Sequence, residues 1–150
     1  MSKISPCLWF DGEAEEAARF YVSLLPGSRI ETVQTNPIDT PAGPAGSVLV
    51  VEFTLAGQTF MALNGGTRFA HTLATSFRIA CADQGEVDRL WAALCADGGQ
   101  AQQCGWLIDR YGVPWQITPA ALLADPARAP RVMAALMGMV KLDLAALEAA

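Results

Sequence analysis

The sequence is poor in several residue types, and each shortage excludes a class of protein. Its 150 residues include a single histidine, His71, so a histidine-rich metal site cannot be built. Ten Lys and Arg residues oppose fifteen Asp and Glu residues without any basic cluster, which argues against binding to nucleic acid or to an anionic membrane. Charged residues make up only 17% and hydrophobic residues 52%, so a disordered chain is also excluded.

Long hydrophobic runs and cysteine motifs are also missing. No uninterrupted apolar stretch approaches the roughly 20 residues that cross a bilayer. The N-terminal residues lack the apolar segment of a signal peptide. The four cysteines are widely spaced without a C-x-x-C pair, which indicates reduced thiols rather than disulfides or a zinc ribbon. We therefore expect a cytoplasmic protein.

The spacing of hydrophobic residues predicts the same order of elements twice: a strand, a helix and three strands. Helical spacing predicts helices over 13–25 and 83–96, each directly after a strand. The predicted strands are 4–10, 29–35, 47–55 and 59–63 in the first half, and 76–81, 100–103, 105–109 and 113–118 in the second. Beyond residue 119 the pattern predicts helices over 130–140 and 143–149.

An internal sequence match supports this repeat. Phe20-Tyr21 aligns with Leu90-Trp91, so we expect each helix to direct an aromatic side chain at its sheet. Each half is too small to bury a core alone. We therefore predict an α+β fold for the single domain 1–150, with two βαβββ modules and a helical tail, at about 3–66, 74–119 and 120–150.

Two strings of residues carry a family resemblance. They are Cys7-Leu8-Trp9-Phe10-Asp11-Gly12 and Cys104-Gly105-Trp106-Leu107, the second followed by Trp115-Gln116. The chain resembles the PhnB-like branch of the vicinal-oxygen-chelate superfamily, the glyoxalase/bleomycin-resistance/dioxygenase fold, over nearly its whole length. This branch often carries a 3-demethylubiquinone-9 3-methyltransferase label. The resemblance implies that the sheets of the two modules curl around a pocket and that the protein is a homodimer.

The resemblance also implies where a metal would bind. In metal-using members of the superfamily, four side chains hold one divalent ion, which acts as a Lewis acid on neighbouring substrate oxygens. These positions fall on Pro6, Ala62, Ser76 or Phe77, and Gln116. The neutral amide of Gln116 holds a metal poorly without charged ligands beside it. We therefore predict a pocket without a metal ion or other cofactor.

Seven residues are predicted to bind a ligand in that pocket. Aromatic side chains on a curled sheet can stack on a flat molecule, and polar side chains can orient it. The seven residues are Trp9, Asn64, His71, Ser76, Cys104, Trp106 and Gln116. Other interpretations stay open: a solvated loop position for His71, a buried small side chain for Cys104, and core packing for Trp106. The superfamily pattern gives the pocket to Gln116 and the helix side to Trp115.

The predicted function is metal-independent binding of a small organic molecule, as in sequestration of a drug or toxin. One alternative is a lyase, isomerase or dioxygenase with an unusual divalent metal site around Gln116 and His71. Another is an enzyme matching the methyltransferase label, although no G-x-G-x-x-G turn follows a strand. A third is a dimeric structural protein with a filled pocket. In the tail, Met133, Met137 and Val140 form a stripe that packs on the domain or contacts a second copy.

Overall fold

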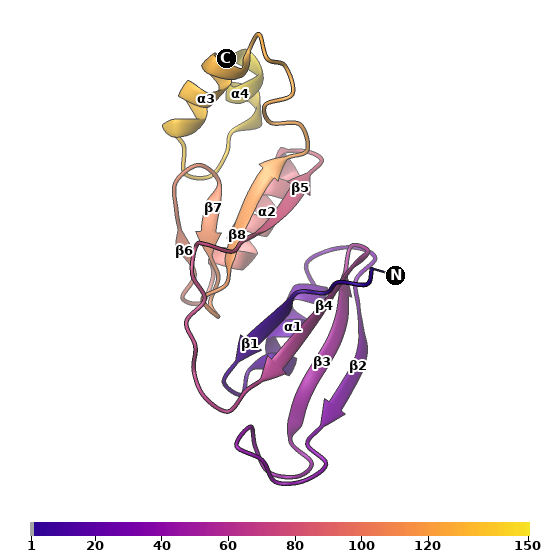
Figure 1. Ribbon diagram of the computed structural model, residues 1–150. Coiled ribbons are helices and arrows are strands. Elements are labelled where there is room, and N and C mark those ends of the chain that lie inside the picture. Colours follow the sequence, from indigo (N-terminus) through magenta and orange to yellow (C-terminus); the bar gives the residue numbers. More distant parts are fainter. Residues whose placement is uncertain (1) are drawn as a thin grey trace. The chain divides into compact units, whose positions relative to one another are not determined.

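The order strand, helix and three strands occurs twice in the computed structural model, which describes residues 2–150. The chain divides into two compact units, Met1–Ala70 and His71–Ala150, and each contains one such module (Figure 1). The division falls inside the predicted connector between the modules. The α+β class, the two βαβββ modules and the helical tail are therefore confirmed.

The first unit contains a four-stranded sheet with one helix on it. In chain order its elements are β1 (Cys7–Phe10), α1 (Ala14–Val22), β2 (Arg29–Thr35), β3 (Val48–Leu55) and β4 (Gln58–Asn64). The strands lie in the order β1-β4-β3-β2, and only the β1–β4 pair is parallel. Tyr21 of α1 stacks on Phe53 of β3, which stacks in turn on Phe60 of β4. This aromatic row forms the centre of the first core.

The second unit repeats the topology. Its module contains β5 (Phe77–Cys81), α2 (Gln84–Cys95), β6 (Gln100–Ala101), β7 (Trp106–Ile108) and β8 (Pro114–Pro119). The strands lie in the order β5-β8-β7-β6, again with one parallel pair, β5–β8. Asp83 caps α2 by accepting a hydrogen bond from the Glu86 N–H at 2.8 Å.

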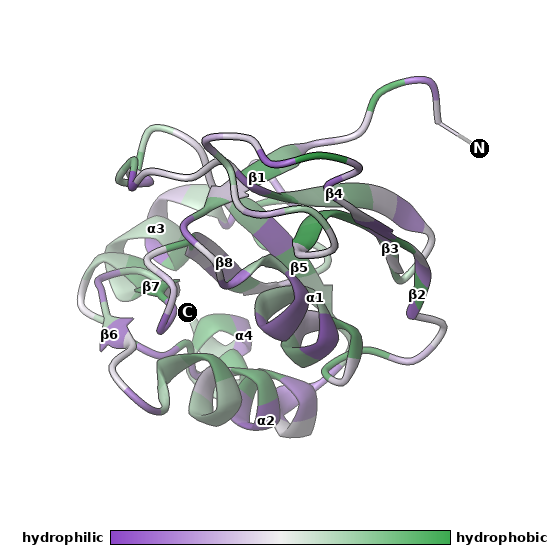
Figure 2. Ribbon diagram, turned by 90° about the horizontal axis from the view of Figure 1, so that it is seen from below, coloured by the Kyte–Doolittle hydropathy of each residue, from purple (hydrophilic) through white to green (hydrophobic). Residues whose placement is uncertain are grey.

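The two aligned helices bury neighbouring positions rather than the same one. Tyr21 is buried in the first core, but Trp91 is only partly buried and Leu90 takes the fully buried position in α2. Figure 2 shows both hydrophilic and hydrophobic residues along α1 and α2, as expected for helices with one face on a sheet. Trp91 is therefore less buried than Tyr21, the residue with which it aligns.

The tail packs as two helices, α3 (Ala129–Met137) and α4 (Leu144–Ala149), around its own apolar cluster. The segment between them is fixed to α2 by an ion pair between Lys141 and Asp88 at 2.7 Å and by two hydrogen bonds of the Gln84 side chain. The contacts with Lys141 and Gln84 lower the pKa of the Asp88 carboxyl. Helix α3 ends earlier than predicted, at the residue before Gly138.

None of the helices described over residues 2–150 combines the length and the apolar character that a membrane crossing requires.

Candidate functional site

Each sheet has one face covered by its helix and an opposite face, called here the outer face. In β8, Trp115 and Ile117 are buried on the helix side, so Gln116 between them lies on the outer face. The register places Arg78 of β5 and Trp106 of β7 directly beside Gln116 on the neighbouring strands. The outer face of the second sheet therefore combines an amide, a guanidinium and an indole.

Hydrogen bonds fix the polar members of this group. The Gln116 amide Nε2 donates to Ser76 Oγ at 2.9 Å. Arg78 Nε donates to Thr118 Oγ1 at 2.6 Å, and its Nη2 donates to the carbonyl oxygen of Pro119 at 2.6 Å. Among residues 2–150, no carboxylate lies within ion-pair distance of Arg78. The face thus presents a positive charge that is held in place by neutral groups.

Three predicted ligand-binding residues, Ser76, Trp106 and Gln116, are brought together on this face, whereas Arg78 was not predicted. The signal for Arg78 is present in the sequence. It follows Ser76 by two positions in a strand, so strand alternation puts both side chains on one face. A charged residue in a short strand also fits an exposed edge, so the sequence alone does not single out Arg78.

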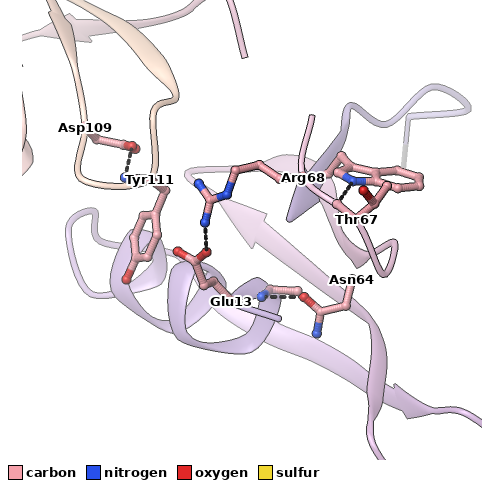
Figure 3. Close-up of polar contacts among 8 residues, drawn as sticks. Glu13, Asn64, Thr67, Arg68, Asp109 and Tyr111 are labelled. Atoms are coloured by element: carbon pink, nitrogen blue, oxygen red, sulfur yellow. Dashed lines mark hydrogen bonds and ion pairs between the residues drawn. The ribbon is translucent and has the colours of Figure 1, made fainter. Parts of the chain in front are cut away.

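Trp9 lies on the outer face of the first sheet. In β1 it alternates with Leu8 and Phe10, which are buried under α1. Its indole Nε1 donates to the Thr67 carbonyl at 2.7 Å, and its ring lies 5.1 Å from that of Phe69. The same segment is held by an ion pair between Arg68 and Glu13 at 3.3 Å (Figure 3).

Asn64 lies on the helix-facing side of β4, where its amide stabilises the fold. Its Oδ1 accepts from the N–H of Ala14 at 2.9 Å, and its Nδ2 donates to the Val48 carbonyl at 3.1 Å. Figure 3 shows the side chain directed at the start of α1, next to Glu13. Asn64 also borders a cavity of about 300 Å³, which the loop before β3 encloses together with the start of α1. The two hydrogen bonds of the Asn64 amide explain its position in the fold without a bound ligand.

The remaining two predicted residues lie elsewhere in the second unit. His71 is the first residue of that unit and is partly exposed in the segment that precedes β5. Cys104 has a positive φ of 61°, donates its N–H to the Met139 carbonyl, and packs against the apolar cluster of the tail. The structure therefore does not place Cys104 with the outer-face group.

The thiols are poor candidates for nucleophiles. Burial, followed by the charge of Glu86, raises the pKa of the Cys81 thiol to about 11. Burial also raises the pKa values of Cys7 and Cys95. A thiol reacts as the thiolate, and the raised pKa values keep these three thiols mainly protonated at neutral pH.

The metal-ligand positions implied by the resemblance do not fit a divalent ion. Ala62 is fully buried under α1 and Pro6 has no ligating group, while Met61 and Leu63 flank Ala62 on the outer face. In the second unit, Phe77 packs on Trp115 on the helix side. Ser76 and Gln116 share their face with the Arg78 guanidinium. Within residues 2–150, no three His, Cys, Asp or Glu side chains gather as a metal-binding group.

Comparison with known proteins agrees with this architecture. Residues 2–118 match the protein family described as 3-demethylubiquinone-9 3-methyltransferase. The PhnB protein of Bacillus cereus, whose structure carries the same methyltransferase name, is 35% identical with a TM-score of 0.72, over 79% of this chain and 100% of its own. No curated protein matches the sequence.

More distant structures share the fold alone. Protein PA1353 of Pseudomonas aeruginosa is 24% identical with a TM-score of 0.64, over 79% of this chain and 98% of its own. A glyoxalase/bleomycin resistance protein of Albidiferax ferrireducens is 19% identical with a TM-score of 0.50, over 77% and 97%. The chain therefore belongs to the PhnB-like family described as 3-demethylubiquinone-9 3-methyltransferase, and it shares its fold with a glyoxalase/bleomycin resistance protein.

Proposed function

We propose that this protein binds a small organic molecule on the outer face of its second sheet without a metal ion. One observation carries the proposal: Ser76, Trp106 and Gln116 come from three separate segments and meet on one face, with Gln116 in the middle and Arg78 beside it. An aromatic surface beside a few fixed polar groups is the usual composition of a small-molecule site.

Arg78 favours a ligand with an anionic group. Its guanidinium is held by Thr118 and by backbone carbonyls, so the orientation of the group is set before a ligand arrives. A planar guanidinium bonds carboxylate oxygens well, and such charged hydrogen bonds are stronger than neutral ones. Trp106 lies on β7, two strands away from Arg78 on β5, and supplies a flat surface for an aromatic ring. An aromatic carboxylate combines both features.

The positive charge of Arg78 also disfavours a catalytic metal ion at this position. A divalent cation bound by Gln116 would lie beside the positive guanidinium of Arg78, and like charges at such short range repel. Neither Ser76 nor Gln116 brings a negative charge to offset that repulsion. The face is therefore better suited to an organic anion than to a Lewis-acid metal.

Methyl transfer, which the family description names, is not part of the proposal. The usual S-adenosylmethionine site has a Gly-rich turn between a strand and a helix, by analogy with dinucleotide sites. In this chain the β1–α1 turn contains one glycine, Gly12, and the β5–α2 turn contains none. Micromolar binding of S-adenosylmethionine, measured by calorimetry, would replace the proposal with that activity.

We also propose that the protein works as a homodimer in the cytoplasm. In the tail, Met133, Met137 and Val140 are exposed, with Met137 the most exposed at 63%. An adaptable apolar stripe of this kind suits contact with a second copy. The four cysteines are free thiols, which suits a reducing compartment. Light scattering of the Met137→Lys variant tests the dimer, because a charge on the stripe should shift the mass to that of a monomer.

Thermal unfolding tests the binding proposal. With EDTA present, naphthoate should raise the melting temperature of the wild-type protein, because a ligand that binds only the folded state stabilises it. The Arg78→Gln and Trp106→Ala variants should lose this rise, whereas Arg131→Gln, a matched change on the exposed surface of α3, should keep it. A rise produced by zinc or manganese and reversed by EDTA would contradict the proposal.

A further inference from the structure

The turn before Trp106 is held in place by the tail of the chain. The N–H groups of Cys104 and Gly105 donate to two successive carbonyls of the segment 139–144, at 2.9 and 2.8 Å. This segment, called here the strap, leads from the end of α3 into α4. We infer that the strap is a positioning element for Trp106, so that attachment of the strap and ligand binding on the outer face of the second sheet stabilise each other.

The backbone of this turn needs support from outside the sheet. Cys104 and Gly105 have φ values of 61° and 82°, in a region that is unfavourable for a residue with a side chain such as Cys104. Gly105 is also buried, so its N–H requires a partner within the protein. The Val140 carbonyl is that partner, and the Met139 carbonyl accepts from Cys104. The strap therefore stabilises a turn conformation that the sheet alone leaves incomplete.

Close packing also joins the strap to the turn. A Cβ atom at Gly105 would lie 3.0 Å from Cγ of Leu142, so the strap packs against bare backbone there. Leu142 is fully buried in the apolar cluster of the tail, on which Cys104 also packs. On the side of the sheet, the Gly105 carbonyl accepts from the Ile117 N–H of β8 at 2.8 Å. Trp106 follows directly in the chain, so a shift of the turn moves the start of β7 as well.

Further contacts attach the strap to the start of α2. The Gln84 side chain donates to the Leu142 carbonyl at 3.0 Å and accepts from the Leu144 N–H at 2.8 Å. Lys141 forms an ion pair with Asp88 at 2.7 Å. Helix α2 covers the face of the sheet opposite the outer face, so these contacts lie away from a ligand bound there.

The strap lies beyond the part of the chain that matches the family, which ends at residue 118. Cys104, Gly105 and Trp106 lie inside the matched part, whereas the carbonyls that support their turn come from the tail. Positioning by the strap is therefore a property of this chain that the family match does not carry over.

Hydrogen exchange of the wild-type protein tests the coupling, which rests on the proposed function. The main reporter is the Leu144 N–H, because its partner Gln84 lies on the helix side, where a ligand on the outer face does not cover it. If the ligand binds only when the strap is attached, naphthoate at about ten times its Kd should slow exchange of Leu144, Cys104 and Gly105 by about tenfold. The rates are compared over times in which Leu94, in the core of α2, does not exchange, so that unfolding of the whole unit does not contribute.

A variant tests the attachment itself without a ligand. Gln84→Ala removes both hydrogen bonds to the strap, so Cys104 and Gly105 should exchange about tenfold faster and the indole N–H resonance of Trp106 should shift. Gln34→Ala, the same change on the exposed strand β2, should leave the exchange and the resonance unchanged. If Gln84→Ala fails to fold, the effect of naphthoate on Leu144 in the wild-type protein still decides the matter.

Failure of the strap and failure of the proposed function give different results. If naphthoate does not bind the wild-type protein, the proposed function is overturned and the coupling with it. If naphthoate binds but leaves the exchange of Leu144 unchanged, the strap inference alone is overturned. A folded Gln84→Ala variant with wild-type exchange and an unshifted Trp106 resonance would overturn it as well.

Discussion

The indole nitrogen of Trp115 donates a hydrogen bond to the carboxylate of Asp109 at 2.9 Å inside the second module. The other oxygen of that carboxylate accepts from the N–H groups of Tyr111 and Val113, at 2.8 and 3.0 Å (Figure 3 shows the Tyr111 bond). Asp109 is only 2% exposed. These bonds close the turn between β7 and β8, hold Trp115 on the helix side, and so direct Gln116 to the outer face.

Replacing Asp109 with alanine should therefore destabilise the second module. Three donors, two of them buried and one partly buried, lose their acceptor, so the free energy of unfolding should fall by about 3 kcal/mol. Urea denaturation measures the change. Trp115→Phe removes one of the three bonds and keeps an aromatic ring, so it should cost less. Equal stability of Asp109→Ala and the wild-type protein would show that the network contributes nothing.

The Asn64→Ala variant tests whether Asn64 stabilises the fold or binds the ligand. The variant removes the acceptor for the first N–H of α1 and the donor to Val48, so we expect a loss of about 2 kcal/mol in unfolding free energy. Binding of naphthoate to the folded variant should be unchanged, because Asn64 lies on the helix-facing side of the first sheet. If the fully folded variant bound naphthoate more weakly than the wild-type protein, Asn64 would belong to the binding site.

Gly65→Ala tests the close packing under Trp9. A Cβ atom at this position would lie 1.8 Å from Cζ2 of the Trp9 indole, so the ring must move and lose its bond to Thr67. We expect a loss of about 1–3 kcal/mol, typical of overpacking, together with a change in tryptophan fluorescence. In the Trp9→Ala background the same change should cost much less. Equal costs in the two backgrounds would refute the proposed contact.

The raised pKa of Cys81 predicts a loss of stability in alkaline solution. Burial and Glu86 raise this pKa from 9.0 to about 11 in the folded protein. Below pH 9 the thiol is protonated in both states and its contribution is fully present. Between pH 9 and 11 only the unfolded chain ionises, so the free energy of unfolding should fall as the pH rises.

Urea denaturation at a series of pH values measures that fall. The Cys81→Ala variant should show a shallower slope, whereas Cys104→Ala, which keeps the Cys81 thiol, should show the full slope. Identical slopes in all three proteins would mean that Cys81 titrates alike in the folded and unfolded states.

Much of the fold follows from the sequence because its hydrophobic periodicities are strong. The strand predicted at 29–35 agrees with β2 at both ends, and Asp143, where the last predicted helix begins, caps α4. Ends set by tertiary contacts were harder to predict. The first strand begins at Cys7 rather than Ile4, because β4 pairs with it only from Cys7 to Phe10. In α2, Leu90 rather than Trp91 is fully buried.

Part of the candidate site could be predicted from the sequence, and the part that depends on tertiary contacts could not. Alternation within β8 puts Trp115 and Gln116 on opposite faces, and the superfamily pattern correctly gives the helix side to Trp115. The β-bulge at Glu31 was not predicted, because it depends on the pairing of β2 with β3. Cys104 is joined to the tail by a backbone hydrogen bond to the Met139 carbonyl, which no motif in the sequence indicates.

Native mass spectrometry of freshly purified protein, prepared without chelator, tests the central claim most directly, because it detects metal and carried ligand in one spectrum. The account predicts a folded protein that carries no metal ion and that takes up naphthoate in the wild-type form but not in Arg78→Gln. One zinc, nickel, manganese or iron ion per chain would contradict metal-independent binding, and equal uptake of naphthoate by Arg78→Gln would contradict the assigned site.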